Sequence, residues 1–286
     1  MSDLFLPKLP EVMITPCVQA ALLEDLGRAG DITTDSVIPP HVQSHVVLSG
    51  REHGVIAGIE FARIAFSLID PLLQFEAGIA DGEAVKPGQI IAHIRGSARS
   101  ILTAERVALN FMGHLSGIAT ATALIAKEIA HTRAKISCTR KTTPGLRFAE
   151  KFAVRAGGGR NHRFGLDDAI LIKDNHIAIA GGVGVAIERA KAHAGHLVKI
   201  EVEVDTLAQL QEALVHRPDV VLLDNMSPAT LREAVGIING QAIAEASGRI
   251  NHETAHEIAE TGVDLLSAGW LTHSAKVLDL GLDFAG

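Results

Sequence analysis

The segment KIEVEVDTLAQLQEALVHRPDVVLLD (199–224) contains one unit of a pattern that recurs through the second half of the chain. A short apolar run, KIEVEV, is followed by a stretch with helical periodicity and then by a second apolar run, DVVLLD. Strands that alternate with helices in this way predict a parallel sheet, because each helix returns the chain to the starting edge. Further runs of this kind are KISCT (135–139), AILIKD (169–174), AIAEAS (242–247) and DLLSAG (264–269).

The six runs begin 34, 30, 20, 23 and 22 residues apart, which is the spacing of strand–helix units. Six such units with polar residues at the strand ends predict a closed or nearly closed α/β barrel. The first hundred residues differ, because glycine-rich turns and one helical piece near Phe61 to Ile69 separate their strand-like runs. They predict a smaller α+β unit with strands at HVVLSG (45–50), GVIAGI (54–59), LLQFEAGI (72–79) and QIIAHIRG (89–96).

A long helix is expected at TAERVALNFMGHLSGIATATALIAKEIA (103–130). Thr103 is predicted to cap it, and Glu105 in the first turn would complement the helix dipole. Residues 107–126 carry no formally charged side chain, but polar residues such as Asn110 and His114 interrupt the stretch. We therefore expect a buried helix of a soluble protein and not a membrane span.

Composition places the 286-residue chain among soluble globular proteins, with 47% hydrophobic and 21% charged residues. Nine Phe, one Trp and no Tyr are too few for a platform that stacks nucleic-acid bases, and a net charge of -7 argues against a polyanion binder. Cys17 and Cys138 form no CxxC pair, which excludes a disulfide scaffold and a thiolate zinc site. The first twenty residues lack the pattern of a signal peptide, so the cytoplasm is the expected compartment.

Positive charge is concentrated in one part of this acidic chain. Residues 133–173 contain ten Lys or Arg and three acids, a balance of +7, whereas the remainder contains sixteen basic and thirty acidic residues, a balance of -14. A basic segment in an acidic protein indicates a local pocket for small anions.

The ends of the predicted strands carry the candidate functional residues, because active sites of α/β barrels lie at the carboxyl ends of their strands. The first two ends carry cations, the middle two carboxylates, and the last two small residues that open helices. This order fits a phosphorylated, multiply anionic substrate, since backbone N–H groups at such loops and helix N-termini bind phosphate. The residues are Thr139, Arg140 and Lys141; Lys173, Asp174, Asn175 and His176; Glu203; Asp224 and Asn225; Ser247 and Gly248; Ser267, Ala268 and Gly269.

The residues alone leave several roles open for these side chains. Glu203 and Asp224 predict hydrogen bonds to a ribose, or contact with a magnesium ion that substrate phosphates carry, because two acids make no dedicated metal cage. Glu203 is alternatively a strand residue paired with a neighbouring lysine. Lys173 is alternatively the Schiff-base nucleophile of a barrel lyase.

Seven segments in order resemble the quinolinate phosphoribosyltransferase family, whose members are also called carboxylating nicotinate-nucleotide pyrophosphorylases. The resemblance implies an N-terminal α/β sandwich domain at residues 1–115, joined by the tail at 275–286, and an open α/β barrel at 116–274. The matching segments are EDLGRAGDITTDSVIP (24–39), TAERVALNFMGHLSGIAT (103–120), CTRKTTPGLRFAEKFAVRAGGGRNHRFGLDDAILIKDNHI (138–177), KIEVEVDTLAQL (199–210), LLDNMSP (222–228), SGRI (247–250) and TGVDLLSAGWLTHS (261–274).

The family joins quinolinate to 5-phosphoribosyl 1-pyrophosphate and forms nicotinate mononucleotide, pyrophosphate and carbon dioxide, a step of NAD biosynthesis. The resemblance implies that a cationic group binds the quinolinate carboxylates and that Lys141, beside Thr139, lies near the anionic substrates. Guanidinium groups suit this role because they bind carboxylates with two hydrogen bonds. The cationic group is Arg140, His162, Arg163 and Lys173.

The resemblance also assigns the phosphoribosyl half of the site. Glu203 and Asp224 match acids around the ribose and the magnesium pyrophosphate, and His176 lies near the same groups. Arg106 matches an arginine that crosses the interface of a homodimer into the neighbouring site, and assembly beyond the dimer is left open. The loops that match the 5-phosphate site are Ser247, Gly248 and Arg249, and Ser267, Ala268 and Gly269.

Three positions depart from the family pattern. Cys138 stands where Asp often precedes the TRK motif, and we interpret it as a small buried thiol. Arg249 replaces a common Gly or Asn in the first phosphate loop, and Trp270 replaces a common Ala. A related pyrophosphorylase branch, associated with molybdenum transport, differs around the NHR and KDNH motifs; both are intact here, at 161–163 and 173–176, which favours the quinolinate enzyme.

Overall fold

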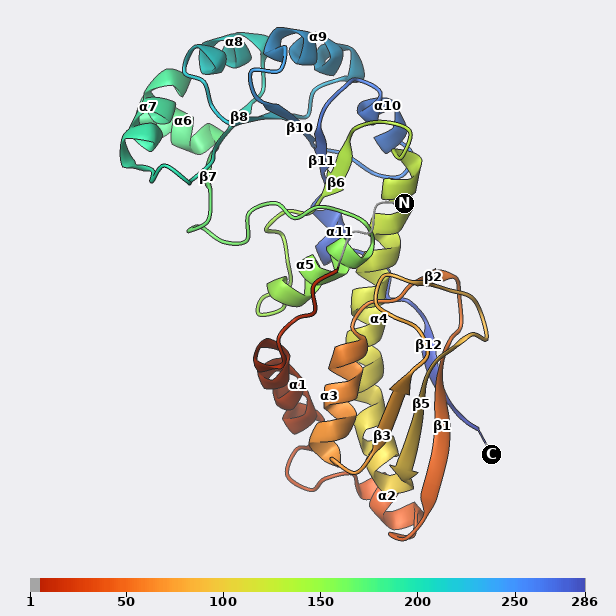
Figure 1. Cartoon of the computed structure of the whole chain (residues 1–286). Helices are drawn as coiled ribbons and strands as arrows, with labels where there is room; N and C mark the ends of the chain where they lie inside the picture. The colour runs from red at the N-terminus through yellow and green to blue at the C-terminus, as the bar shows by residue number, and fades with distance from the viewer. Residues whose placement is uncertain (1–5, 286) are drawn as a thin grey trace. The chain divides into compact units, whose positions relative to one another are not determined.

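The chain folds into two units, each built around its own sheet, in a computed structural model that describes residues 6–285 (Figure 1). One unit comprises Leu124–Lys141 and Gly159–Leu271. The other comprises the described residues up to Ala123, Thr142–Gly158 and the segment from Thr272 onward. The segment Thr142–Gly158 groups with the N-terminal residues, although it lies within the predicted barrel range. The predicted domain boundaries therefore stay a prediction.

The barrel unit contains six parallel strands in the order β6-β11-β10-β9-β8-β7. Each lies within one of the six predicted runs, so the strand predictions are confirmed. Because β6 and β7 occupy the two ends of this order, the sheet is open. Of the closed or nearly closed barrel that the repeat predicts, the closed form is not observed, and the open barrel that the resemblance implies is confirmed. The strands are β6 (Lys135–Ser137), β7 (Ile170–Ile172), β8 (Ile200–Val204), β9 (Val220–Asp224), β10 (Ile243–Ser247) and β11 (Leu265–Ser267).

Helices cover the sheet, and two of them begin at residues whose side chains cap the helix. Thr206 caps α8 by accepting a hydrogen bond from the Gln209 backbone N–H at 3.2 Å, and Ser227 caps α9 just before a proline at its first position. Figure 1 shows α7, α8 and α9 along the outer side of the row of strands. The helices are α6 (Asp174–Ala180), α7 (Val183–His193), α8 (Leu207–Val215), α9 (Pro228–Ile238), α10 (Ala255–Ala259) and α11 (Trp270–His273).

Arg160 attaches the segment before β7 to the edge of the sheet. Its backbone N–H donates to Ile136 O at 2.8 Å, and its carbonyl oxygen accepts from the Cys138 N–H at 3.2 Å. This isolated parallel bridge lies against β6. It holds the start of the segment that carries His162 and Arg163.

The other unit contains an antiparallel sheet in the order β12-β1-β5-β3, packed with helices. Because β12 pairs with β1, the C-terminal segment completes the N-terminal sheet. The sheet strands are β1 (Gln43–Gly50), β3 (Gln74–Ala77), β5 (Ile90–Ser97) and β12 (Leu280–Phe284), and β2 (Gly54–Val55) pairs with β4 (Ala84–Val85). The helices are α1 (Glu11–Leu26), α2 (Ile32–Val37), α3 (Ile59–Ile69), α4 (Ala98–Glu128) and α5 (Arg147–Ala156).

The long helix α4 corrects one local prediction. It begins at Ala98, directly after β5, so Thr103 lies inside it and does not cap it. The Thr103 hydroxyl instead donates to Asp31 Oδ2 at 3.2 Å, and Asp31 caps α2. Among the described helices, α4 alone has the length and composition of a membrane span, but 61% of its most apolar window is buried, as in a core helix of a soluble protein.

Candidate active site

The register of the parallel sheet aligns the carboxyl ends of four strands. Asp224 on β9 lies beside Ser247 on β10, Ser247 lies beside Ser267 on β11, and Ser267 lies beside Ser137 on β6. The Ala268 N–H donates to Ser137 O at 3.0 Å and holds the turn after β11 against β6. The polar strand ends therefore share one edge of the sheet.

Lys173 and two acids form the charged centre of this edge. Lys173 immediately follows β7, and its Nζ lies 3.9 Å from Glu203 Oε2 on β8. Burial raises the pKa of Glu203, Lys173 opposes that rise, and Asp224 adds to it through like-charge repulsion. Lys173 and Asp224 therefore act on Glu203 with opposite effects. His176 supports this corner, since its Nδ1 accepts from the Lys173 backbone N–H at 2.9 Å.

Arg163 is a half-buried cation beside a second arginine. One of its terminal nitrogens donates to Ala169 O at 3.0 Å, whereas its Nε is buried and donates to no residue of the described chain. Burial lowers the pKa of Arg163, and the charge of Arg140 lowers it further. Two guanidinium groups that repel one another, one with an unused buried N–H, have the charge and the donor that an anion would require.

The turn after β11 runs close to the motif that follows β6. The Lys141 backbone N–H donates to Thr139 Oγ1 at 3.0 Å. A Cβ atom at Gly269 would lie 2.7 Å from Lys141 Cδ and 3.2 Å from Thr139 Oγ1, so the turn passes close to both side chains. The predicted neighbours Thr139, Lys141 and Gly269 are thus brought together.

The loop after β10 has a strained backbone that needs glycine. Gly248 has φ +94°, and a Cβ there would lie 2.2 Å from Asn225 Oδ1. Arg249 has φ +54° and Asn225 has φ +51°, both in the left-handed region. The Asn225 N–H donates to Ser247 O at 2.9 Å, and its Nδ2 donates to Asp224 Oδ2 at 2.6 Å. Asn225 therefore joins the predicted phosphate loop to the acid on β9.

Two buried glutamates beneath His162 were missed by the sequence analysis. His162 Nε2 lies 2.8 Å from Glu201 Oε2 and 3.7 Å from Glu245 Oε1, and both carboxyl groups are almost fully buried. Burial, with repulsion from Glu201, raises the pKa of Glu245 to about 7. The other ring nitrogen, Nδ1, accepts from the Arg163 N–H at 2.8 Å. His162 thus links the buried pair to the arginine of the site.

The structure shows which atoms surround Cys138 and Trp270, two of the positions that depart from the family pattern, and where Arg106 lies. Cys138 is buried, with its Sγ 3.4 Å from Asn161 Oδ1, which confirms the small buried thiol. Trp270 Nε1 donates to Ile250 O at 2.7 Å and so bridges the turns after β10 and β11. Arg106 lies on α4 in the other unit, where its side chain is exposed.

Models of two protein-domain families match the chain. The quinolinate phosphoribosyl transferase C-terminal domain matches residues 118–283, and the N-terminal domain matches residues 31–116. The chain is 42% identical to quinolinate phosphoribosyltransferase [decarboxylating] 1b of Nicotiana tabacum, over 96% of this chain and 83% of that one.

Bacterial proteins also match this chain over most of its length. The chain is 43% identical to a probable nicotinate-nucleotide pyrophosphorylase [carboxylating] of Bacillus subtilis, over 91% of this chain and 90% of that one. The structure of the nicotinate-nucleotide pyrophosphorylase from Francisella tularensis superimposes with a TM-score of 0.93 at 40% identity, covering 97% of this chain and 98% of that one. The strand-end chemistry and these matches together show that the chain belongs to the quinolinate phosphoribosyltransferase family.

Proposed function

We propose that this protein transfers the phosphoribosyl group of 5-phosphoribosyl 1-pyrophosphate to quinolinate with decarboxylation, at the carboxyl ends of the six parallel strands. The observation that carries the assignment is the half-buried guanidinium of Arg163, repelled by Arg140 and with an unused N–H. A dicarboxylate supplies the negative charge and hydrogen-bond acceptors that this pair requires.

The quinolinate half of the site uses Arg140, Arg163 and Lys173 for direct contact with carboxylates. His162 was expected to join them, but both of its ring nitrogens already face protein groups, Glu201 and the Arg163 N–H. We assign His162 to positioning, since it fixes the backbone from which the Arg163 side chain extends.

The phosphoribosyl half uses the acids and the small-residue loops. The loop at Ser247–Arg249 offers backbone N–H groups to the 5-phosphate, and the predicted second loop, Ser267–Gly269, lies beside the cationic side chain of Lys141. Glu203 and Asp224 accept hydrogen bonds from the ribose.

The donor set also fits magnesium. Glu203 and Asp224 are carboxylates on adjacent strands, and magnesium favours oxygen ligands. A bound magnesium ion would be held by Glu203, Asp224 and the pyrophosphate, and it would supply positive charge against the departing group. Two protein carboxylates are enough for this ion, because the pyrophosphate would supply the other ligands, and their presence supports the proposal.

Catalysis in this arrangement is positioning and charge stabilisation. The arginines and Lys173 hold quinolinate so that its ring nitrogen faces ribose C1 as the C1–pyrophosphate bond breaks. The ring nitrogen becomes cationic once the new bond forms, and it then stabilises the carbanion that loss of the adjacent 2-carboxylate leaves. No covalent bond to the enzyme is required.

The Schiff-base alternative is disfavoured by the surroundings of Lys173. Its side chain is 50% exposed and faces Glu203, whereas a nucleophilic lysine needs a desolvated site that favours the neutral amine. Borohydride added with a carbonyl substrate should leave no label on Lys173; a labelled Lys173 would support the lyase.

The decisive assay mixes the purified protein with quinolinate labelled in its 2-carboxylate, phosphoribosyl pyrophosphate and magnesium. Nicotinate mononucleotide and labelled carbon dioxide should form in equal amounts and depend on all three additions. Binding without release of carbon dioxide, or transfer to another acceptor in preference to quinolinate, would contradict the assignment. The latter result is expected of the pyrophosphorylase branch associated with molybdenum transport.

We also propose a homodimer in which Arg106 enters the neighbouring site, supported by its exposed position on α4. A cytoplasmic location is supported by the two cysteine thiols, since cytosolic proteins keep such groups reduced.

A further inference from the structure

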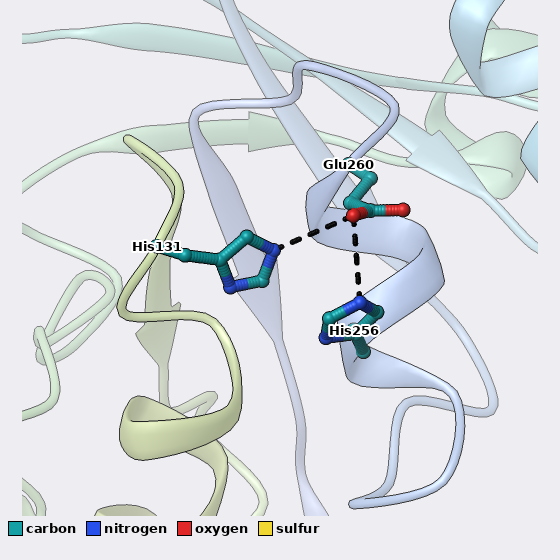
Figure 2. Close-up of side chains that lie close together, drawn as sticks. All are labelled: His131, His256 and Glu260. Carbon is teal, nitrogen blue, oxygen red and sulfur yellow. Dashed lines mark ion pairs between the residues drawn. The ribbon is translucent and has the colours of Figure 1, made fainter.

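Three side chains far from the active-site residues in the sequence meet on the surface of the barrel unit (Figure 2). His131 lies between α4 and β6, whereas His256 and Glu260 lie one turn apart at α10. The chain segments come together because β6 and β11, the strands that follow them, are neighbours in the sheet. Figure 2 shows both imidazole rings turned toward the Glu260 carboxylate.

The distances within this group are too long for hydrogen bonds. Glu260 Oε1 lies 3.6 Å from His131 Nε2 and 3.4 Å from His256 Nε2. Hydrogen bonds from N–H to oxygen normally span about 2.7–3.2 Å. One oxygen thus lies between two ring nitrogens without bonding closely to either.

The same distances suit three ligands of one metal ion. Zinc binds histidine nitrogen and carboxylate oxygen at about 2.0–2.2 Å in tetrahedral geometry, which places neighbouring ligand atoms about 3.4 Å apart. Each of the three residues offers a ligand atom, and these atoms all lie within 4.8 Å of one another. Only small side-chain movements are therefore needed for all three to reach a common centre.

Exposure leaves room for the metal and a fourth ligand. The side chains of His131, His256 and Glu260 are 45%, 53% and 48% exposed. Water can therefore complete a tetrahedral shell, as in sites with three protein ligands. The two rings are roughly stacked, with centroids 4.6 Å apart and planes at 27°.

We propose that His131, His256 and Glu260 form a surface binding site for a zinc ion. The ion joins the segment after α4 to α10 and thereby ties together the two connections that lead into β6 and β11. Because β6 is an edge strand of an open sheet, this link stabilises the folded barrel unit when zinc is present. The site shares no residue with the proposed catalytic group.

The test is zinc binding by the full chain after treatment with a chelator. Zinc is titrated in competition with a chromophoric chelator, with excess magnesium present to occupy the oxygen-only site at Glu203 and Asp224. One equivalent should bind, and the thermal midpoint should rise with zinc concentration. Cobalt in place of zinc should give the visible absorption of a tetrahedral site with nitrogen and oxygen ligands.

Matched variants separate this site from other histidines. His131→Ala and Glu260→Gln should each lose the bound equivalent and the thermal shift, while His252→Ala, an exposed histidine close to α10 in the sequence, should keep both. Circular dichroism without metal checks that all variants fold. Failure of the wild type to bind zinc, or equal binding by His131→Ala, would overturn the proposal, whatever the catalytic assay shows.

Discussion

Replacing Glu245 by Gln tests the buried pair beneath His162. Glu245 is 2% exposed, and burial with repulsion from Glu201 raises its pKa from 4.5 to about 7. A carboxyl group with a raised pKa in the folded state stabilises the fold at low pH, below its unfolded pKa, and loses that contribution as pH rises through about 7. Glutamine has nearly the same shape and no such titration.

The size of the effect follows from the shift in pKa. A rise from 4.5 to about 7 corresponds to about 3 kcal/mol, at about 1.36 kcal/mol for each unit. The unfolding free energy of Glu245→Gln, minus that of the wild type, should therefore increase by up to about 3 kcal/mol between about pH 4.5 and pH 8. Titrating groups outside the cluster of His162, Glu201 and Glu245 are common to both proteins and largely cancel in this difference.

Urea unfolding of both proteins at a series of pH values measures the difference. It should be nearly the same in low and high salt, because a desolvation effect in the interior is screened little. A difference that does not change with pH would refute the reasoning, since Glu245 would then be ionised in the fold without cost.

Three further changes probe the proposed site. Arg163→Lys removes the bidentate contact with a carboxylate. The loss of about 1.5–3 kcal/mol should lower kcat/KM for quinolinate about 10- to 100-fold. An unchanged kcat/KM in steady-state kinetics would count against Arg163 as a ligand of quinolinate. Gly248→Ala places a Cβ 2.2 Å from Asn225 Oδ1 at a positive φ, so the loop conformation should cost about 1–2 kcal/mol. This cost should raise KM for phosphoribosyl pyrophosphate about tenfold. A normal KM would show that the loop lies outside the site. Arg106→Ala mixed with Arg163→Ala should regain about a quarter of the wild-type activity, since half the random dimers have one intact site; no recovery after proven subunit exchange would exclude the crossing.

The strands and their polar ends were predictable because they depend on local pattern. A run such as DVVLLD has the composition of a buried strand, and its final Asp224 marks the carboxyl end where parallel strands place their chemistry. Glycines were also informative, because Gly248 and Gly269 lie where a Cβ would collide with a neighbour.

Sheet closure and buried charge were not predictable from the same patterns. Spacing counts strands but does not tell whether the first and last strands pair, so the open edges at β6 and β7 could be expected from the family resemblance but not from the repeat. Glu201 and Glu245 are single acids within apolar strands, and a strand pattern does not tell whether such an acid faces solvent or interior. Thr103 looked like a helix cap because a cap is recognised by residue type, whereas the preceding β5 leads directly into the helix.

The Arg160 bridge has a consequence for motion. Arg160 is joined to the β6 segment by two backbone hydrogen bonds in the described structure, at 2.8 and 3.2 Å. In contrast, β9 pairs over its length with β8 and β10. We therefore expect the backbone at Arg160 to separate from β6 while the central strands stay intact. Deuterium should replace the amide protons of Arg160 and Cys138 through local opening, long before it reaches those of β9 and β10. The residues proposed to bind the pyridine ring thus follow a short bridge at one edge of the open sheet.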